Sequence, residues 1–91
     1  MSEAGPDVRR KKLRWRSWHR GTREMDLLVG GFADSHLAQM NDEQLDRFEQ
    51  LLHTPDPDLY RWLVGRERPP EDFDHDVLHM MQNFKFTPRS G

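Results

Sequence analysis

The chain has 91 residues, 34% of them apolar and 33% charged, with three Trp and five Phe. This length allows one small domain with a modest core, and the aromatic content argues against disorder of the whole chain. The absence of Cys excludes a disulfide framework and a thiolate metal site. The opening MSEAGPDV lacks a signal-peptide pattern, and no apolar run approaches the roughly 18 residues of a membrane span. We therefore expect a soluble intracellular protein without membrane insertion.

The formal net charge is only −2, but the charges are unevenly distributed. No acid lies between Val8 and Arg23, whereas most of the 16 acids follow this stretch. The basic residues within it are Arg9, Arg10, Lys11, Lys12, Arg14, Arg16, Arg20 and Arg23. The sequence thus predicts a basic end and an acidic body.

The first predicted helix spans residues 8–19, which include neither Gly nor Pro and place Trp15 and Trp18 one turn apart. The second is amphipathic, because its apolar residues recur at steps of three and four, at Met25, Leu28, Val29, Phe32, Leu37 and Met40. Gly30 and Gly31 interrupt it, at about 1 kcal/mol each relative to Ala. They predict either a kink or the close approach of a neighbouring backbone.

The third predicted helix begins after Asn41, which can cap it while Gln44 reaches back in a capping box. It ends near Thr54, and its buried face is expected to comprise Leu45, Phe48, Leu51 and Leu52. A short fourth helix follows in DPDLYRWL. Its predicted signals are Asp56 as N-cap, Pro57 as first helical residue, Asp58 beside the positive end of the dipole, and Gly65 as the stop.

The last predicted helix follows the break at Pro69–Pro70 and carries Phe73, Val77, Met80, Met81 and Phe84. No segment alternates with a period of two for long enough to predict a strand, and no repeat is visible. The predicted fold is an all-α, single-domain five-helix bundle over residues 8–86, with residues 1–7 and 87–91 as flexible tails. Its expected core includes Leu28, Phe32, Leu45, Phe48, Leu52, Trp62, Leu63, Val77 and Phe84.

The stretch WHRGTREMDLL joins the first two predicted helices and has two interpretations. In the structural one, Gly21 ends the first helix in a left-handed conformation and Arg20 lies at the negative end of that helix's dipole. Thr22 then caps the second helix and Glu24 meets its positive end. In the functional one, two opposite charges lie at the edge of a rigid corner that docks a partner.

The combination of motifs resembles a known family. Arg20, Gly21 and Glu24 form R-G-x-x-E after a basic, Trp-bearing helix, and DPDLYRW, residues 56–62, follows about thirty residues later. This order is similar to the flavin-assembly factors of succinate dehydrogenase, the SdhE or succinate dehydrogenase assembly factor 2 family, over roughly residues 9–84. One departure is Gly30–Gly31, where such proteins more often carry bulkier residues.

The resemblance implies an assembly factor that is not an enzyme. Such proteins bind the flavoprotein subunit of succinate dehydrogenase, and often of fumarate reductase, and promote covalent attachment of FAD to a histidine of that subunit. The partner, rather than this chain, would therefore hold FAD stably. A cytoplasmic location is expected in a bacterium, with the mitochondrial matrix as the eukaryotic equivalent, although no transit-peptide pattern is seen.

The resemblance also assigns candidate partner-binding residues. Arg20 and Glu24 would contact the flavin-proximal surface of the partner, and Gly21 would let the two backbones approach closely. Supporting contacts would come from Arg16, His19 and Arg23. Asp58 and Tyr60 are further candidates, for which capping and packing are the alternatives.

Other kinds of site have weaker signals. His75 and His79 have the i, i+4 spacing of a helical metal pair, but no third ligand is evident and we expect no metal site. No phosphate-binding loop or nucleophile signature occurs, so we expect no catalytic residue.

The competing functional class is a small nucleic-acid-binding protein. Basic residues interleaved with Trp15 and Trp18 suit phosphate contact and base stacking, yet the net charge of −2 opposes binding to a polyanion. A regulatory helical module, suggested only by the charge asymmetry, is the third alternative. Our expectation is a protein partner and no nucleic acid.

Overall fold

The computed structural model describes residues 6–84, which contain five α-helices and no strand. This confirms the predicted all-α fold. The elements in chain order are α1 (Pro6–Ser17), α2 (Arg23–His36), the 3-10 helix η1 (Leu37–Gln39), α3 (Asp42–Leu52), α4 (Asp56–Leu63), the 3-10 helix η2 (Glu71–Phe73) and α5 (Asp76–Asn83).

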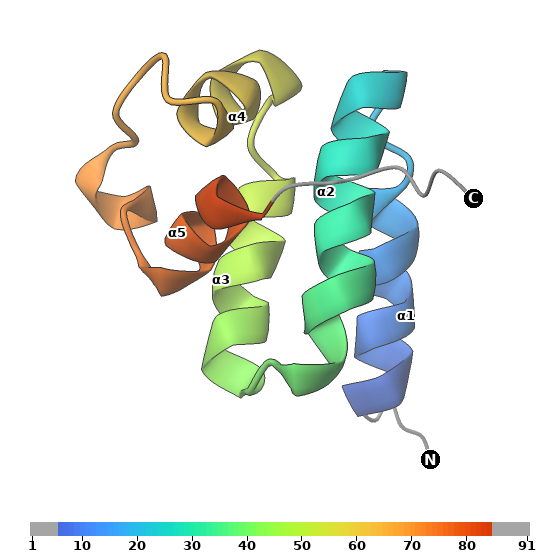
Figure 1. The fold of residues 1–91 in the computed structure, drawn as a ribbon. Coiled ribbons are helices and arrows are strands. Elements are labelled where there is room, and N and C mark those ends of the chain that lie inside the picture. Colours follow the sequence, from blue (N-terminus) through green and yellow to red (C-terminus); the bar gives the residue numbers. More distant parts are fainter. Residues whose placement is uncertain (1–5, 85–91) are drawn as a thin grey trace.

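The first three helices run up, down and up, side by side, as Figure 1 shows. Helix α5 packs against α3 on the side away from α1, and the short α4 lies at the end where α2 begins. Because the connection from α3 to α4 is short, the beginnings of α2 and α4 lie at the same end of the molecule. The R-G-x-x-E stretch is at that end.

The predicted caps determine most helix boundaries. Thr22 accepts a hydrogen bond from the Met25 N–H, and Asn41 and Gln44 form the complete capping box. Gly65 has φ +81° and follows α4 with the paired backbone bonds of a Schellman motif.

Three boundaries differ from the sequence prediction. Helix α1 begins at Pro6, because proline is well tolerated in a first turn, so residues 6 and 7 belong to the helix and not to a tail. Helix α2 ends at His36, and the chain tightens into η1 before Met40. Helix α5 begins only at Asp76, which places Phe73 in η2. The remainder of the predicted tails, residues 1–5 and 87–91, lies outside the described residues, as do residues 85 and 86 of the predicted domain.

The core lies where α2 and α3 meet α1, α4 and α5. Phe32 and Phe48 are fully buried at its centre, with ring centroids 5.7 Å apart. Most of the predicted core residues are buried, namely Phe32, Leu45, Phe48, Leu52, Trp62 and Val77. The other three, Leu28, Leu63 and Phe84, are partly buried and pack against this core. Leu13 adds a buried contact from α1 that periodicity did not single out.

Gly30 accommodates an aromatic ring. A Cβ atom built there would lie 2.3 Å from Cδ2 and 2.7 Å from Cγ of Trp18, so the indole rests directly on the glycine. The Trp18 Nε1–H also donates to Asp34 Oδ1 at 3.2 Å. Helix α2 continues through Gly30 and Gly31 without the interruption that the sequence predicted. The group that approaches Gly30 is a side chain and not the backbone of a neighbouring element.

None of the helices between residues 6 and 84 has the length and apolar character that crossing a bilayer requires.

We predict that Gly30→Ala destabilises the fold even though alanine favours helix formation. Displacing the Trp18 indole costs about 1–3 kcal/mol, which exceeds the gain of about 1 kcal/mol in helix propensity. In a Trp18→Ala background the indole is absent, so the same glycine substitution should become stabilising. Urea unfolding of the four variants measures this sign reversal. Additive effects would show that the indole does not determine the need for glycine.

A second prediction concerns His75, which caps α5 by accepting the Leu78 N–H at Nδ1, 3.2 Å away. Burial lowers the pKa of His75; Arg47 and His79 act in the same direction, and Asp76 opposes them. The folded state therefore favours neutral imidazole. The resulting stability is complete above the unfolded pKa of about 6.5 and is lost as the pH falls through that value towards the lowered folded pKa.

His75→Asn keeps a capping oxygen and removes this proton linkage. Compared with the unchanged chain, the variant should lose less free energy of unfolding between about pH 7.5 and pH 5.5. Denaturant titrations at the two pH values measure the difference, which isolates His75 from the other four histidines. Equal losses in both proteins would contradict the capping role.

Candidate functional site

The candidate site is built on the connection between α1 and α2. Gly21 has φ +122°, a backbone conformation that side chains rarely adopt, and a Cβ atom there would meet nothing within 4 Å. Because α1 ends at Ser17, Gly21 does not terminate α1 as the sequence predicted. Instead it redirects the chain immediately before Thr22, the N-cap of α2.

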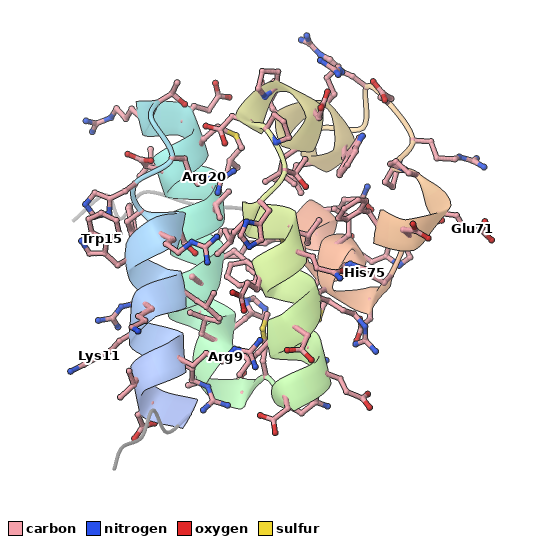
Figure 2. The ribbon with its side chains drawn as sticks, turned by 180° about the vertical axis from the view of Figure 1, so that it is seen from behind. Arg9, Lys11, Trp15, Arg20, Glu71 and His75 are labelled. Atoms are coloured by element: carbon pink, nitrogen blue, oxygen red, sulfur yellow. The ribbon has the colours of Figure 1, made fainter. Side chains whose placement is uncertain are left out.

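The Arg20 side chain lies inside the molecule, only 9% exposed. Its Nε–H group donates to Oδ1 of Asp56 at 2.9 Å, and Nη2 forms an ion pair with the same oxygen at 2.7 Å. Nη1 donates to the Leu52 carbonyl at 2.7 Å, and Nη2 donates to the Thr54 carbonyl at 2.9 Å. Figure 2 shows Arg20 near the beginning of α2 and the end of α3. One guanidinium therefore joins the α1–α2 connection to the α3–α4 connection.

These contacts change the dipole assignment for Arg20. The sequence predicted that it lies at the negative end of α1, but the Leu52 carbonyl is at the end of α3. Arg20 thus satisfies a terminal carbonyl of α3 that is 32 residues away in the sequence.

Asp56 also has a different position from the one predicted. Pro55 occupies the N-cap of α4 without a side-chain hydrogen bond, so Asp56 is the first helical residue and Pro57 the second. The carboxylate is free to accept from Arg20 because it does not cap its own helix. It still lies at the positive end of the α4 dipole.

Asp26 fixes the backbone of the same corner. Its Oδ1 accepts the Arg20 N–H at 2.7 Å, while its own N–H donates to the Thr22 carbonyl at 2.9 Å. Asp26 is not among the site residues that the sequence predicted. The only signal for it was an acid in the first turn of a helix, which is common because of the dipole.

Glu24 and Tyr60 form the exposed half of the corner. The Tyr60 hydroxyl donates to Glu24 Oε2 at 3.1 Å, which links α2 to α4 across 36 residues. They line a hollow of 280 Å³ together with Thr22, Met25, Asp56 and Pro57. This volume lies below the range of about 300–1,000 Å³ typical of pockets that enclose a small ligand.

We define the docking corner as Arg20, Gly21, Glu24, Asp56 and Tyr60. The structure brings these residues together, whereas the other predicted residues have separate surroundings. Arg16 lies 3.6 Å from Glu49 on α3, and Asp58 pairs with Arg61 on its own helix.

Two further candidates lie beside the docking corner. The exposed His19 ring stacks on Trp15, with ring centroids 3.8 Å apart. Arg23 is exposed in the first turn of α2 and has no side-chain ion pair among residues 6–84. Both are therefore accessible to a partner next to Gly21.

The histidines noted in the sequence analysis do not form a metal site within the part of the chain that the structure describes. No group of three or more potential ligands occurs there. His75 caps α5, and His79 Nε2 contacts Asp74 Oδ1 at 2.5 Å. Both side chains thus have structural partners.

Comparison with known proteins relates this arrangement to a family. The family model described as "Flavinator of succinate dehydrogenase" matches residues 11–85. A similar protein, "FAD assembly factor SdhE" from Acetobacter pasteurianus, is 42% identical over the whole chain and 84% of its own length. "Succinate dehydrogenase assembly factor 2, mitochondrial" from Dictyostelium discoideum is 39% identical over 81% of this chain. The protein of the same name from Saccharomyces cerevisiae is 43% identical over 86% of this chain.

The chain spans about half the length of these mitochondrial relatives, 52% and 51% respectively. Their names and the family match support the resemblance drawn from the R-G-x-x-E and DPDLYRW motifs. They give no support to the nucleic-acid-binding alternative.

The corner geometry predicts a large loss of stability when one of its charged residues is replaced and almost no change when another is. Arg20→Ala removes four buried contacts and leaves Asp56 without its cation, so it should lower the free energy of unfolding by about 3 kcal/mol. Glu24→Gln keeps an acceptor for Tyr60 at an exposed position, so it should change stability by less than about 0.5 kcal/mol. Denaturant unfolding measures both. A small effect of Arg20→Ala would refute its structural role.

Proposed function

This chain belongs to the flavinators of succinate dehydrogenase, and we propose that it is an assembly factor that binds the flavoprotein subunit of that enzyme. In this role it promotes covalent attachment of FAD to a histidine of the subunit. The main support is that the R-G-x-x-E residues form one corner whose exposed side belongs to Gly21 and Glu24, in a chain 42% identical to an FAD assembly factor.

The buried and the exposed residues of the docking corner have different roles. Arg20 is a positioning residue, because its guanidinium binds Asp56 and two backbone carbonyls within this molecule. Glu24 presents its carboxylate at the surface, where Tyr60 restricts its orientation. Gly21 has open space where a Cβ atom would be, so the backbone of a partner can approach it closely.

The proposed mechanism is positioning rather than catalysis by this chain. The chemistry of flavin attachment belongs to the flavin and to the partner's histidine, and FAD is held by the partner. A rigid corner pressed against a mobile part of the flavoprotein can hold histidine, flavin and a stabilising charge in a reactive arrangement. This chain would not be an enzyme, because the reaction is completed within its partner.

The docking corner would also bind the flavoprotein subunit of fumarate reductase, where that subunit has the same surface as its counterpart in succinate dehydrogenase. Arg23 and His19 are the accessible supporting residues beside the corner. Arg16 and Asp58 would support it indirectly, through their ion pairs with Glu49 and Arg61. We propose the cytoplasm as the compartment in a bacterium and the mitochondrial matrix in a eukaryote.

The test is flavinylation in cells that lack their own assembly factor. Glu24→Ala should reduce covalent flavin on the dehydrogenase subunit to the level of an empty vector, while the melting temperature stays nearly unchanged. Covalent flavin is measured by fluorescence of the subunit in a denaturing gel, which requires no enzyme turnover. Glu71→Ala is the matched control, because Glu71 is an exposed acid in η2, away from the docking corner.

The outcomes separate the alternatives. Wild-type fluorescence with Glu24→Ala would remove the partner-binding role from the exposed carboxylate. Equal losses with Glu24→Ala and Glu71→Ala would indicate a general charge effect instead of a local contact. If the unchanged chain itself restores no covalent flavin, the proposed function is wrong.

A further inference from the structure

A second exposed surface lies on α1 and is not part of the docking corner. Helical spacing places Val8, Lys11, Lys12, Trp15 and His19 on one side of α1 and its continuation, and all five are exposed. We call this set the outer face of α1. Figure 2 shows Lys11 and Trp15 pointing away from the bundle, whereas Arg9 lies between α1 and α3. The opposite side of α1 is buried, with Leu13 2% and Ser17 0% exposed.

Most arginines of the basic stretch are used within the molecule. Arg9 contacts Asp46 and Glu49, and Arg10 donates to the carbonyls of Leu37 and Met40. Arg16 and Arg20 have the partners already described. By contrast, Lys11 and Lys12 form no ion pair or side-chain hydrogen bond with any residue between 6 and 84. The positive charge of the outer face is therefore available to another molecule.

Trp15 is an exposed but ordered aromatic side chain. It is 63% exposed, and with Val8 at 42% it supplies two of the three large exposed apolar side chains of residues 6–84. His19 stacks on the indole at an interplanar angle of 14°, and the His19 Nδ1 atom lies 2.6 Å from the Trp15 carbonyl oxygen. A ring already held in place loses less conformational freedom on binding than a free one. Trp is also among the residue types that are enriched at binding hot spots.

We propose that the outer face of α1 is a second docking surface, which binds an acidic and partly apolar segment of a protein partner. Trp15 and Val8 bury apolar area, while Lys11 and Lys12 pair with carboxylates. This rests on the proposed function, under which the partner is the flavoprotein subunit. The surface reaches the docking corner at His19, next to Arg20, so one partner can cover both.

Charge and shape favour a protein over a polyanion or a membrane. Nucleic-acid binding commonly neutralises about 6–10 phosphates, and the outer face offers only two unpaired lysines beside an acidic body. A helix that binds membranes presents a continuous apolar face, whereas here Lys11 and Lys12 separate Val8 from Trp15. A carboxylate-bearing protein surface matches this alternation.

The experiment measures binding of the full chain to the purified flavoprotein subunit at two salt concentrations. Trp15→Ala should weaken binding about thirtyfold, as expected for a central aromatic contact. Lys11→Glu with Lys12→Glu should weaken binding about tenfold at low salt and less at high salt. The matched control is Arg66→Glu with Arg68→Glu, which makes the same charge change at exposed positions after α4. Melting temperatures should stay near that of the unchanged chain, because all these side chains are exposed.

Each outcome supports or overturns the inference. Unchanged affinity of both outer-face variants, with binding by the unchanged chain intact, would overturn the second surface and leave the proposed function standing. No binding by the unchanged chain would overturn both. Equal weakening by the control would show a net-charge effect and refute a local surface. A further outcome is that the outer-face variants bind the flavoprotein normally and lose binding to single-stranded RNA or to vesicles of phosphatidylserine and phosphatidylcholine. That result would assign the outer face of α1 to a polyanion or a membrane.

Discussion

The interaction on which the site depends is the buried contact between Arg20 and two segments more than thirty residues away. A helix as short as α4, with eight residues, is marginal by itself, and its position must come from tertiary contacts. Arg20 supplies such a contact through Asp56 in the first turn of α4 and through the Leu52 carbonyl at the end of α3. The exposed pair of Glu24 and Tyr60 is a consequence of this arrangement, because Tyr60 reaches α2 only when α4 is held there.

The basic stretch, residues 8–23, suggests one role in the sequence and has another in the structure. In the sequence, eight positive charges without an acid suggest a surface that binds a polyanion. In the structure, most of the arginines among them bind carbonyls and carboxylates of neighbouring elements. Arg10 donates to the Leu37 and Met40 carbonyls around the end of η1, much as Arg20 donates at the end of α3. The planar guanidinium suits this task because it can donate in several fixed directions at once, whereas the lysines remain at the surface. Within residues 6–84, therefore, the arginines of α1 have partners in the same molecule, whereas its two lysines are free to meet another one.

Local signals explain which features could be predicted from the sequence. Apolar periodicity and the caps at Thr22, Asn41 and Gly65 act within a few residues, so the helices and most of the core followed from them. The joining of Arg20 to Asp56 depends on how α1, α3 and α4 pack, and no local pattern encodes it. Gly30 is a similar case, since the Trp18 indole that requires it comes from the connection between α1 and α2. The motif residues themselves were found by resemblance, and only the structure separates the buried Arg20 from the exposed Glu24.

The two ends of the R-G-x-x-E motif therefore have different physical requirements. Replacing Arg20 changes the position of α4 as well as the charge at the corner, so a loss of activity would not distinguish contact from scaffold. Gly21 combines a structural requirement, as Arg20 has, with exposure to a partner, as Glu24 has. Its φ of +122° makes any other residue strained, yet the chain leaves open space where the side chain would be. Crowding within this molecule does not require glycine there. The requirement comes from the turn itself, and the open space beside it is what allows a partner's backbone to approach.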